Sequence, residues 1–255
     1  MPKQYNKTDK LELINRIGFK EHFKANTWED YNQKFFDGLA PKYDVLNEVL
    51  SLGQHQRIKK KFIKRLEIQP KSKILDLCTG SGDIALFIAK QYPDCEVIGT
   101  DVSEKMLDIA QKRSQGFPNV EFRNADTLHL PFEDNSFDTV LIGFGIRNLV
   151  DLNEGIAEMK RVTKEGGKIS SLDLGKPKGV LLNFIHKIHF QTIVPFLGKH
   201  IFHRGEFNSF RYLPESGKHF PPQDALVQIL KSHGLSSVVN YNYMLGSIAQ
   251  QIAIK

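Results

Sequence analysis

Apolar residues in the middle of the chain follow two alternating patterns. Short apolar runs predict buried strands at residues 73–77, 96–101, 120–124, 137–143 and 168–174. Apolar residues at helical spacing predict helices at residues 83–91, 103–113 and 153–162, the last of them closed by Gly166 and Gly167. Strands that alternate with helices in this way indicate a mainly parallel sheet with right-handed crossovers.

Two strand-like runs near the C-terminus, residues 236–241 and 247–254, predict a final antiparallel hairpin on this sheet. We therefore predict an α/β, Rossmann-like fold: a mainly parallel, seven-stranded sheet with helices on both faces and a C-terminal antiparallel hairpin. Residues 1–70 are polar and aromatic with helical spacing, and we expect them to form an N-terminal helical cap. Residues 71–255 are then the main domain, with an insertion at about 176–225.

Composition narrows the class of protein. The chain has 255 residues and a formal net charge of +6, which suits anionic partners such as acidic lipid, nucleic acid or an acidic small molecule, or simply a solvated surface. The two cysteines, Cys78 and Cys95, fit neither a zinc site nor a disulfide framework, so we expect no metal and a reducing compartment. The N-terminus has no signal-peptide pattern and no run is long enough to span a bilayer, which favours the cytoplasm.

The strongest chemical signal is a glycine turn at the end of the first predicted strand. Asp76 is followed by Thr79, Gly80, Ser81 and Gly82, and the glycines let a ligand lie against bare backbone. Asp101 ends the second strand, where a carboxylate can accept both hydroxyls of a ribose. In an open parallel sheet such groups meet at the carboxyl ends of the strands, so they predict a nucleoside-containing cofactor.

Charge separates the two cofactors that such a turn could hold. NAD is the alternative, because Ala85 is an allowed third position of its glycine fingerprint. Asp76 and Asp83 would, however, place negative charge close to a pyrophosphate, whereas a cationic sulfonium with an α-amino group is attracted to them. The residues therefore favour S-adenosyl-L-methionine.

The ends of the third and fourth strands add candidate cofactor contacts. Asn124, Ala125 and Asp126 follow the third strand, where an amide or carboxylate can accept from the adenine amino group; a turn or helix cap is the alternative. We also expect cofactor contacts from residues next to these strand ends: Val102, Met106 and Gly143.

From about residue 30 onward the chain resembles the ubiquinone/menaquinone biosynthesis C-methyltransferase family. The segments that carry the resemblance are 36–47, 51–55, 130–138, 143–148 and 210–216. The resemblance implies a class I S-adenosylmethionine-dependent methyltransferase that methylates a ring carbon of a polyprenylated quinol. It also carries cofactor contacts over to Ser81, Asp101, Asn124 and Ala125. Departures from the family pattern, such as Phe220-Pro221 in place of a His-Pro pair, lie toward the substrate side.

Within this resemblance we expect Arg147 to stabilise negative charge on the ring, because it follows the fourth strand. A salt bridge to an acid is the alternative. We expect Tyr43 and Asn47 to close over the sulfonium and the ring, and His55 and His203 to be candidate proton acceptors. Further substrate contacts are expected from family motif residues: Phe144, Asn148, Arg211 and Tyr212.

The stretch 176–204 is apolar and basic, and no acid occurs from residue 174 through 205. It could receive a prenyl tail and meet an anionic membrane, with the basic run 55–65 adding to the same surface, or it could be a core helix pair with a solvated basic face. Peripheral membrane contact and a homodimer stay open. No nucleic-acid module is evident, so we expect no nucleic acid partner. A methyltransferase for another small molecule or RNA, and a non-catalytic assembly protein, are the competing readings.

Overall fold

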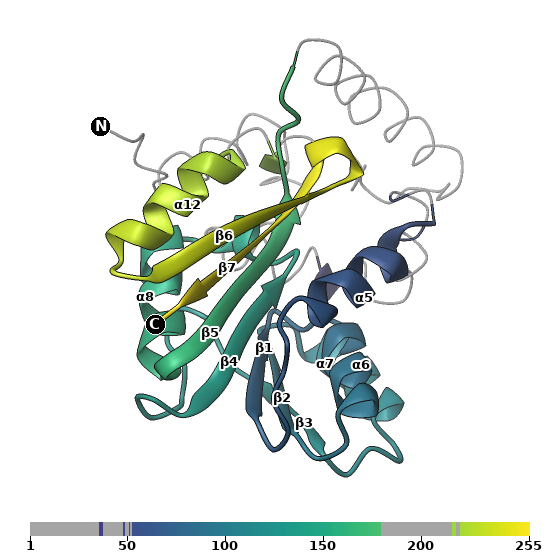
Figure 1. Ribbon diagram of the computed structural model, residues 1–255. Coiled ribbons are helices and arrows are strands. Elements are labelled where there is room, and N and C mark those ends of the chain that lie inside the picture. The colour runs from purple at the N-terminus through teal and green to yellow at the C-terminus, as the bar shows by residue number, and fades with distance from the viewer. Residues whose placement is uncertain (1–35, 38–47, 49–50, 52, 180–215, 218–219) are drawn as a thin grey trace, which may run out of the picture.

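The strands in the described part of the chain form one seven-stranded sheet (Figure 1). The computed structural model describes residues 36–37, 48, 51, 53–179, 216–217 and 220–255. The strand order is β3-β2-β1-β4-β5-β7-β6. The bounds are β1 Lys73–Leu77, β2 Glu96–Asp101, β3 Val120–Asn124, β4 Phe137–Gly143, β5 Thr163–Leu174, β6 Ser236–Tyr243 and β7 Ile248–Ile254. Strands β1 to β5 are parallel and β7 is antiparallel to both of its neighbours, which confirms the predicted sheet and its C-terminal hairpin.

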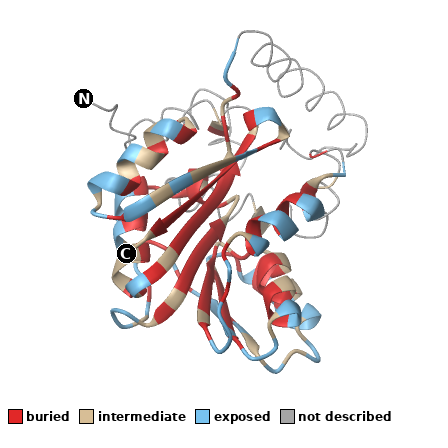
Figure 2. Ribbon diagram, viewed as in Figure 1, coloured by how far each residue is buried: buried red, intermediate tan, exposed pale blue. Residues whose placement is uncertain are grey.

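Helices cover both faces of the sheet. The helix bounds are α5 His55–Lys64, α6 Asp83–Gln91, α7 Glu104–Arg113, α8 Leu152–Val162 and α12 Gln223–Ser232. Side chains of α5, α6 and α7 belong to one buried apolar cluster, and those of α8 and α12 belong to a second. Neighbouring residues of β1, Ile74 and Leu75, are both fully buried but lie in different clusters. A strand covered on both faces must be apolar at successive positions, and Figure 2 shows the buried centre of the sheet.

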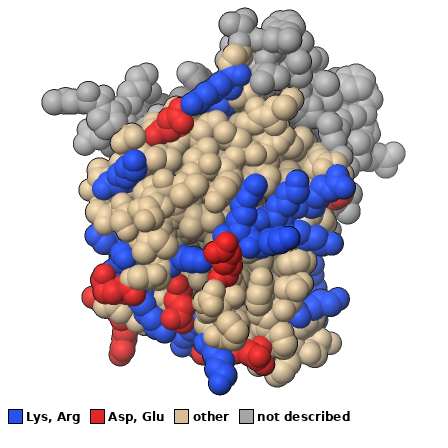
Figure 3. Space-filling model, viewed as in Figure 1, with Lys and Arg blue, Asp and Glu red and all other residues tan. Residues whose placement is uncertain are grey.

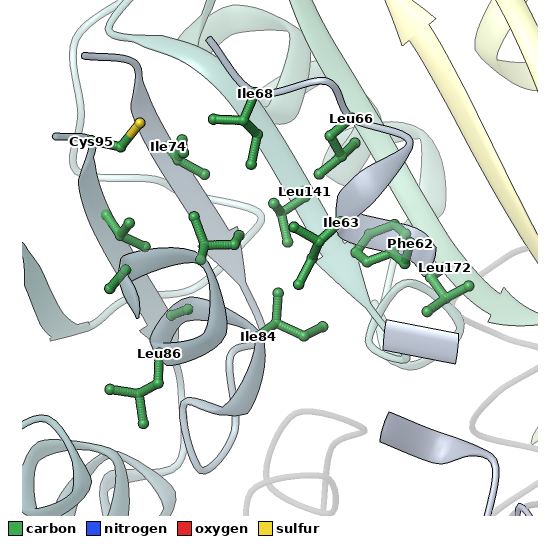
Figure 4. Packing of buried hydrophobic residues seen from close by; sticks show 14 of the residues in the cluster. Phe62, Ile63, Leu66, Ile68, Ile74, Ile84, Leu86, Cys95, Leu141 and Leu172 are labelled. Atoms are coloured by element: carbon green, nitrogen blue, oxygen red, sulfur yellow. The ribbon is translucent and has the colours of Figure 1, made fainter. Parts of the chain in front are cut away.

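Helix α5 is packed into the domain. Its side chains Phe62 and Ile63, with Leu66 just after it, are almost fully buried and pack with Ile74 and other residues of the same cluster (Figure 4). Full burial of a side chain of this size stabilises the fold by roughly 1.5–3 kcal/mol. The backbone is tied down as well, because Lys168 Nζ donates to the carbonyl of Leu66 at 2.6 Å. The position of residue 55, at the start of this helix, is therefore fixed by the core.

The start of β5 differs from the prediction. The predicted helix end at residue 162 is confirmed by α8, which ends at Val162. The strand expected at 168–174 begins earlier, at Thr163, so Gly166 and Gly167, which we expected to close the helix, lie inside β5. The Thr163 hydroxyl donates to the carbonyl of Met159 at 2.6 Å, and the pairing with β4 shifts register between Phe137 and Thr139. Gly166 has a φ of 75°, a conformation that allows the strand to depart from regular pairing at this point.

Candidate cofactor and active site

The turn between β1 and α6 is built around hydrogen bonds and glycines. Thr79 Oγ1 donates to Asp76 Oδ2 at 2.6 Å, and the Thr79 N–H donates to the carbonyl of Thr100 at 2.9 Å. Gly80 and Gly82 have φ angles of 56° and 81°, which favour glycine. A Cβ added at Gly82 would lie 2.7 Å from the ring of Phe122, so only glycine fits there. The backbone of the turn therefore stays bare at the carboxyl edge of the sheet.

Asp101 links this turn to the end of β2. Its Oδ2 accepts from the Gly80 N–H at 2.8 Å and its Oδ1 accepts from the Ser103 N–H at 2.9 Å. Burial raises the pKa of Asp101, and backbone hydrogen bonds from Ser103, Gly80 and Val102 act in the opposite direction. The two carboxylate oxygens have about four lone-pair sites in all, so these bonds do not use the full acceptor capacity of the carboxylate. Such a carboxylate can accept the two hydroxyls of a ribose while it holds the turn in place.

A cavity opens in front of the turn and is negatively lined. Two carboxylates, Asp101 and Asp126, face it, and its described lining includes no lysine or arginine. Its walls are otherwise mostly apolar or neutral, and include Phe36, Cys78, Gly80, Val102, Met106, Ala125, Thr127, Leu128, Gly143, Phe144, Gly145, Asn148, Leu149 and Val150. Opposite charges attract strongly at a partly buried site, so the cavity suits a ligand that is cationic and partly apolar. The residues present therefore fit S-adenosyl-L-methionine.

We expected Asp83 to contribute negative charge near the cofactor, but its charge is compensated by two cations. Its carboxylate pairs with Lys59 at 2.7 Å and with Arg113 at 2.9 Å, and these cations hold the pKa of Asp83 below its usual range against the effect of burial. Asp76 lies fully buried beneath the turn, where burial raises its pKa to about 7. Asp101 and Asp126, rather than Asp83, present negative charge to the cavity.

The ends of β2 and β3 form the other side of the cavity. Val102 and Met106 line it, and Val102 is 39% exposed, which offers an apolar surface to a flat base. Ala125 and Asp126 line it too. Asn124 has a different position, because its Nδ2 donates to the carbonyls of Asp101 and Val102 at 3.2 Å each. Asn124 therefore holds the two strand ends together beside the cavity.

The segment after β4 places an aromatic ring at the junction of two cavities. Phe144 has a φ of 61°, which is unusual for a bulky residue and costs on the order of 1–3 kcal/mol. Its N–H donates to the carbonyl of Leu172 at 2.6 Å, which holds it in that conformation. A Cβ at Gly143 would lie 2.3 Å from Ile84 Cδ1, and one at Gly145 would lie 2.5 Å from Cys78 Cβ. Both glycines allow the close packing that supports Phe144.

Arg147 holds this segment in place through a hydrogen bond to its backbone. It lies in the short helix η2 (Ile146–Asn148), and its Nη1 donates to Asp173 Oδ1 at 2.7 Å and to the carbonyl of Phe144 at 2.6 Å. Its side chain is 7% exposed and that of Asp173 is 2% exposed. We expected the guanidinium to face the reacting centre, but it forms this buried ion pair and does not line the described cavity. The geometry favours a positioning role for Arg147.

His55 begins α5 and lies against Phe144, with the two ring centroids 5.3 Å apart. It is 6% exposed, and its buried Nε2 has no hydrogen-bond partner among the residues that the structure describes. Burial, assisted by the nearby Lys59 charge, lowers the pKa of His55 to about 3, so the imidazole is neutral at neutral pH. It lines a smaller second cavity, which shares Cys78, Gly80, Gly143 and Phe144 with the first.

The structure thus brings together most of the predicted site residues that it describes. Thr79 and Ser81 line the second cavity, while Phe144 and Asn148 line the first. The predicted residues Tyr43, Asn47, His203, Arg211 and Tyr212 lie outside the described residues.

Sequence reasoning missed several apolar lining residues: Phe36, Cys78, Leu128, Leu149 and Val150. Four of them, all except Phe36, lie within a few residues of the carboxyl end of a strand. Their position after a strand end is the signal that could have identified them. Within the described chain no group of histidine, cysteine and acidic side chains is arranged to hold a metal ion, and no helix is long and apolar enough to cross a membrane.

Solved structures share this fold. A methyltransferase from Aquifex aeolicus matches with a TM-score of 0.57 at 18% identity, covering 77% of this chain and 88% of the other. Phosphoethanolamine N-methyltransferase 2 of Haemonchus contortus, solved with S-adenosyl-L-methionine, matches with a TM-score of 0.62 at 16% identity, covering 86% of this chain and 60% of the other. The chain therefore shares the fold of S-adenosylmethionine-dependent methyltransferases.

Sequence comparison is more specific. The chain belongs to the ubiE/COQ5 methyltransferase family, whose model matches residues 24–255. It is 38% identical to a demethylmenaquinone methyltransferase of Thermus thermophilus, over 84% of this chain and 96% of the relative. It is also 38% identical to a ubiquinone/menaquinone biosynthesis C-methyltransferase of Rickettsia bellii, over 91% of this chain and 94% of the relative.

Proposed function

We propose that this enzyme transfers the methyl group of S-adenosyl-L-methionine to a ring carbon of a polyprenylated quinol in menaquinone or ubiquinone biosynthesis. The observation that carries the proposal is a cavity lined by two carboxylates and by the Phe144 ring, in a chain of this family. The relatives named for demethylmenaquinone and for ubiquinone/menaquinone methylation support the substrate class.

The cofactor, when bound, supplies an electrophilic methyl group on a sulfonium. Asp101 would accept the ribose hydroxyls of the cofactor, and the bare backbone at Gly80 would allow its close approach. Asp101 and Asp126 favour the cation by charge. These residues orient the cofactor, and bringing the methyl group and ring carbon into contact is the main contribution to catalysis.

The ring carbon becomes a better nucleophile when a ring hydroxyl loses its proton. After the ring carbon gains the methyl group, it would release its own hydrogen as a proton, so that the ring becomes aromatic again. His55 is the proposed acceptor of the hydroxyl proton, because its imidazole is neutral and its buried Nε2 has no hydrogen-bond partner in the described part of the chain. A developing phenolate beside the imidazole raises the imidazole pKa, because an opposite charge in a buried site favours the protonated form. Phe144 and Asn148 orient the ring, and Arg147 acts as a positioning residue through its bond to the Phe144 carbonyl.

Further parts of the proposal concern two segments that lie mostly outside the described residues. We propose that residues 1–70 and the insertion at about 176–225 supply substrate contacts, among them Tyr43, Asn47, Arg211 and Tyr212. A prenyl tail partitions into lipid, so we also propose that the enzyme works at a membrane surface.

The test is incubation of the full-length protein with methyl-labelled S-adenosyl-L-methionine and, in separate reactions, short-tailed demethylated naphthoquinol, short-tailed demethylated benzoquinol and RNA. Label in one or both quinols, and none in RNA, is the expected result. The Asp101→Ala variant is the matched control, because it removes the proposed ribose contact. Label in RNA alone, or in none of the three substrates, contradicts the proposal.

A further inference from the structure

The exposed side of α5 carries a continuous row of cations. Arg57, Lys60, Lys61 and Lys64 are all exposed, and their spacing of three, four and seven residues places them on one helical face. We refer to these four residues as the basic stripe. Figure 3 shows lysine and arginine side chains gathered over α5. Seven residues of helix span about 10 Å, so the stripe is a compact, elongated patch.

No acid in the described part of the chain pairs with the stripe. Helix α5 contains no aspartate or glutamate. The ion pairs next to it, Lys59 with Asp83 and Lys168 with Glu67, leave the four stripe cations unpaired among the described residues. Like charges three and four residues apart destabilise a helix. A stripe of this kind therefore weakens the helix on its own and suits an anionic surface that would neutralise it.

The opposite face of α5 prevents the helix from moving toward such a surface. Ile58, Phe62 and Ile63 are buried in the core cluster that α5 shares with one face of the sheet. The helix therefore presents its charges as a rigid platform and keeps its apolar residues inside the protein. Binding through the stripe would be electrostatic, without insertion of α5 into lipid.

The stripe also starts beside the site. His55, two residues before Arg57, lines the second cavity together with Gly80 and Phe144. A flat anionic surface against the stripe would thus lie next to the glycine turn. A lipid-borne substrate requires such an arrangement, because its tail stays in the bilayer while its ring enters the site.

We propose that the basic stripe of α5 is the face by which this enzyme docks on an anionic lipid bilayer. The proposal deepens the proposed function, because it rests on a quinol substrate that resides in a membrane. A nucleic acid is a less suitable occupant. Single-strand binding needs exposed aromatic rings between the cations, and the two tyrosines near α5, Tyr241 and Tyr243, are both stacked under Arg65 at 4.2 and 4.9 Å.

The experiment is co-sedimentation of the full-length protein with vesicles made of phosphatidylglycerol and phosphatidylcholine in equal parts, and with vesicles of phosphatidylcholine alone. The stripe variant replaces Arg57, Lys60, Lys61 and Lys64 by glutamine. The matched control replaces four exposed lysines elsewhere by glutamine: Lys90, Lys105, Lys112 and Lys231. Both variants lose the same net charge, so a difference between them reports position.

Each cation close to an anionic bilayer contributes about 1 kcal/mol, which corresponds to about fivefold in partitioning. We expect wild-type protein to bind the anionic vesicles and release them at high salt, and the stripe variant to bind several hundredfold more weakly. The control should bind more tightly than the stripe variant. Equal binding by wild type and stripe variant, equal loss in both variants, or tighter binding of the wild type to single-stranded RNA than to anionic vesicles would overturn the proposal.

Methyl transfer separates this proposal from the proposed function. With a short-tailed quinol in solution, the stripe variant should match wild type; with a long-tailed quinol in anionic vesicles, it should be slower. If neither protein methylates the soluble quinol but the stripe still determines vesicle binding, the proposed function fails and the docking surface stands. If both methylate vesicle-borne quinol equally well, the docking surface fails and the proposed function stands.

Discussion

The buried pair between Arg147 and Asp173 offers a prediction that joins stability to function. Replacing Asp173 by alanine leaves the guanidinium in a pocket where its side chain is 7% exposed. It also removes the acceptor of the Arg147 and Leu174 backbone N–H groups, at 3.2 and 2.7 Å. Removing one partner of a buried ion pair costs about 3–5 kcal/mol, because the remaining charge lacks compensation. Against a typical total of 5–15 kcal/mol, the variant should fold but unfold at much lower urea concentration.

The assay is urea unfolding followed by circular dichroism for four proteins: wild type, Asp173→Ala, Arg147→Met and the double variant. We expect each single variant to lose about 3–5 kcal/mol and the double variant to lose clearly less than the sum, because no uncompensated charge remains. Both single variants should also raise the KM for quinol, since Arg147 holds the Phe144 carbonyl. An Asp173→Ala protein within about 1 kcal/mol of wild type, or losses that simply add, would refute this reasoning.

Three further predictions address the cofactor side. Gly143→Ala should destabilise the protein by about 1–3 kcal/mol and slow methyl transfer, because the added Cβ would lie 2.3 Å from Ile84 Cδ1. Adding Ile84→Val removes that methyl group and should restore part of the lost stability, measured as the midpoint of urea unfolding. Asp101→Asn should weaken cofactor binding by about 10- to 100-fold in titration calorimetry, since an amide N–H would face a backbone donor; unchanged affinity would contradict the ribose contact. Burial raises the pKa of Asp76 from 3.8 to about 7, so the folded state binds this proton more tightly. The stability of wild type relative to Asp76→Asn should therefore fall as pH rises from about 4 to 7, and a constant difference in urea midpoints would exclude this effect.

The fold could be predicted because its apolar patterns have a direct physical cause. Strands β1 and β4 are covered on both faces, so their apolar runs are continuous, and the glycine turn between β1 and α6 needs residues that adopt positive φ. The start of β5 could not be predicted in the same way. In the sequence Gly166 and Gly167 indicate the close of a helix, and only the pairing of Thr163 with Phe137 of β4 shows that they lie inside β5.

Site residues at strand ends could be predicted from the sequence. Charged residues whose partners lie far away along the chain were harder to interpret. Asp101 ends β2, Phe144 follows β4, and both line the cavity. Asp83 was expected to face the cofactor, but Lys59 lies 24 residues earlier in the chain and only the folded structure shows that it pairs with Asp83. Arg147 and Asp173 are likewise 26 residues apart. Local sequence identifies a charged residue near a site, and tertiary packing decides whether its charge is already compensated.

The central claim is methylation of a quinol ring carbon, and the most direct measurement locates the transferred methyl group. The protein would be incubated with carbon-13 methyl-labelled S-adenosyl-L-methionine and a short-tailed demethylated naphthoquinol or, in a separate reaction, the corresponding benzoquinol. Nuclear magnetic resonance would then show which atom of the product carries the labelled methyl group. We predict a methyl group bonded to a ring carbon in at least one product, and none with Asp101→Ala at a cofactor concentration that saturates only the wild type. A methyl group on a ring oxygen, or no transfer to either quinol, would contradict the account.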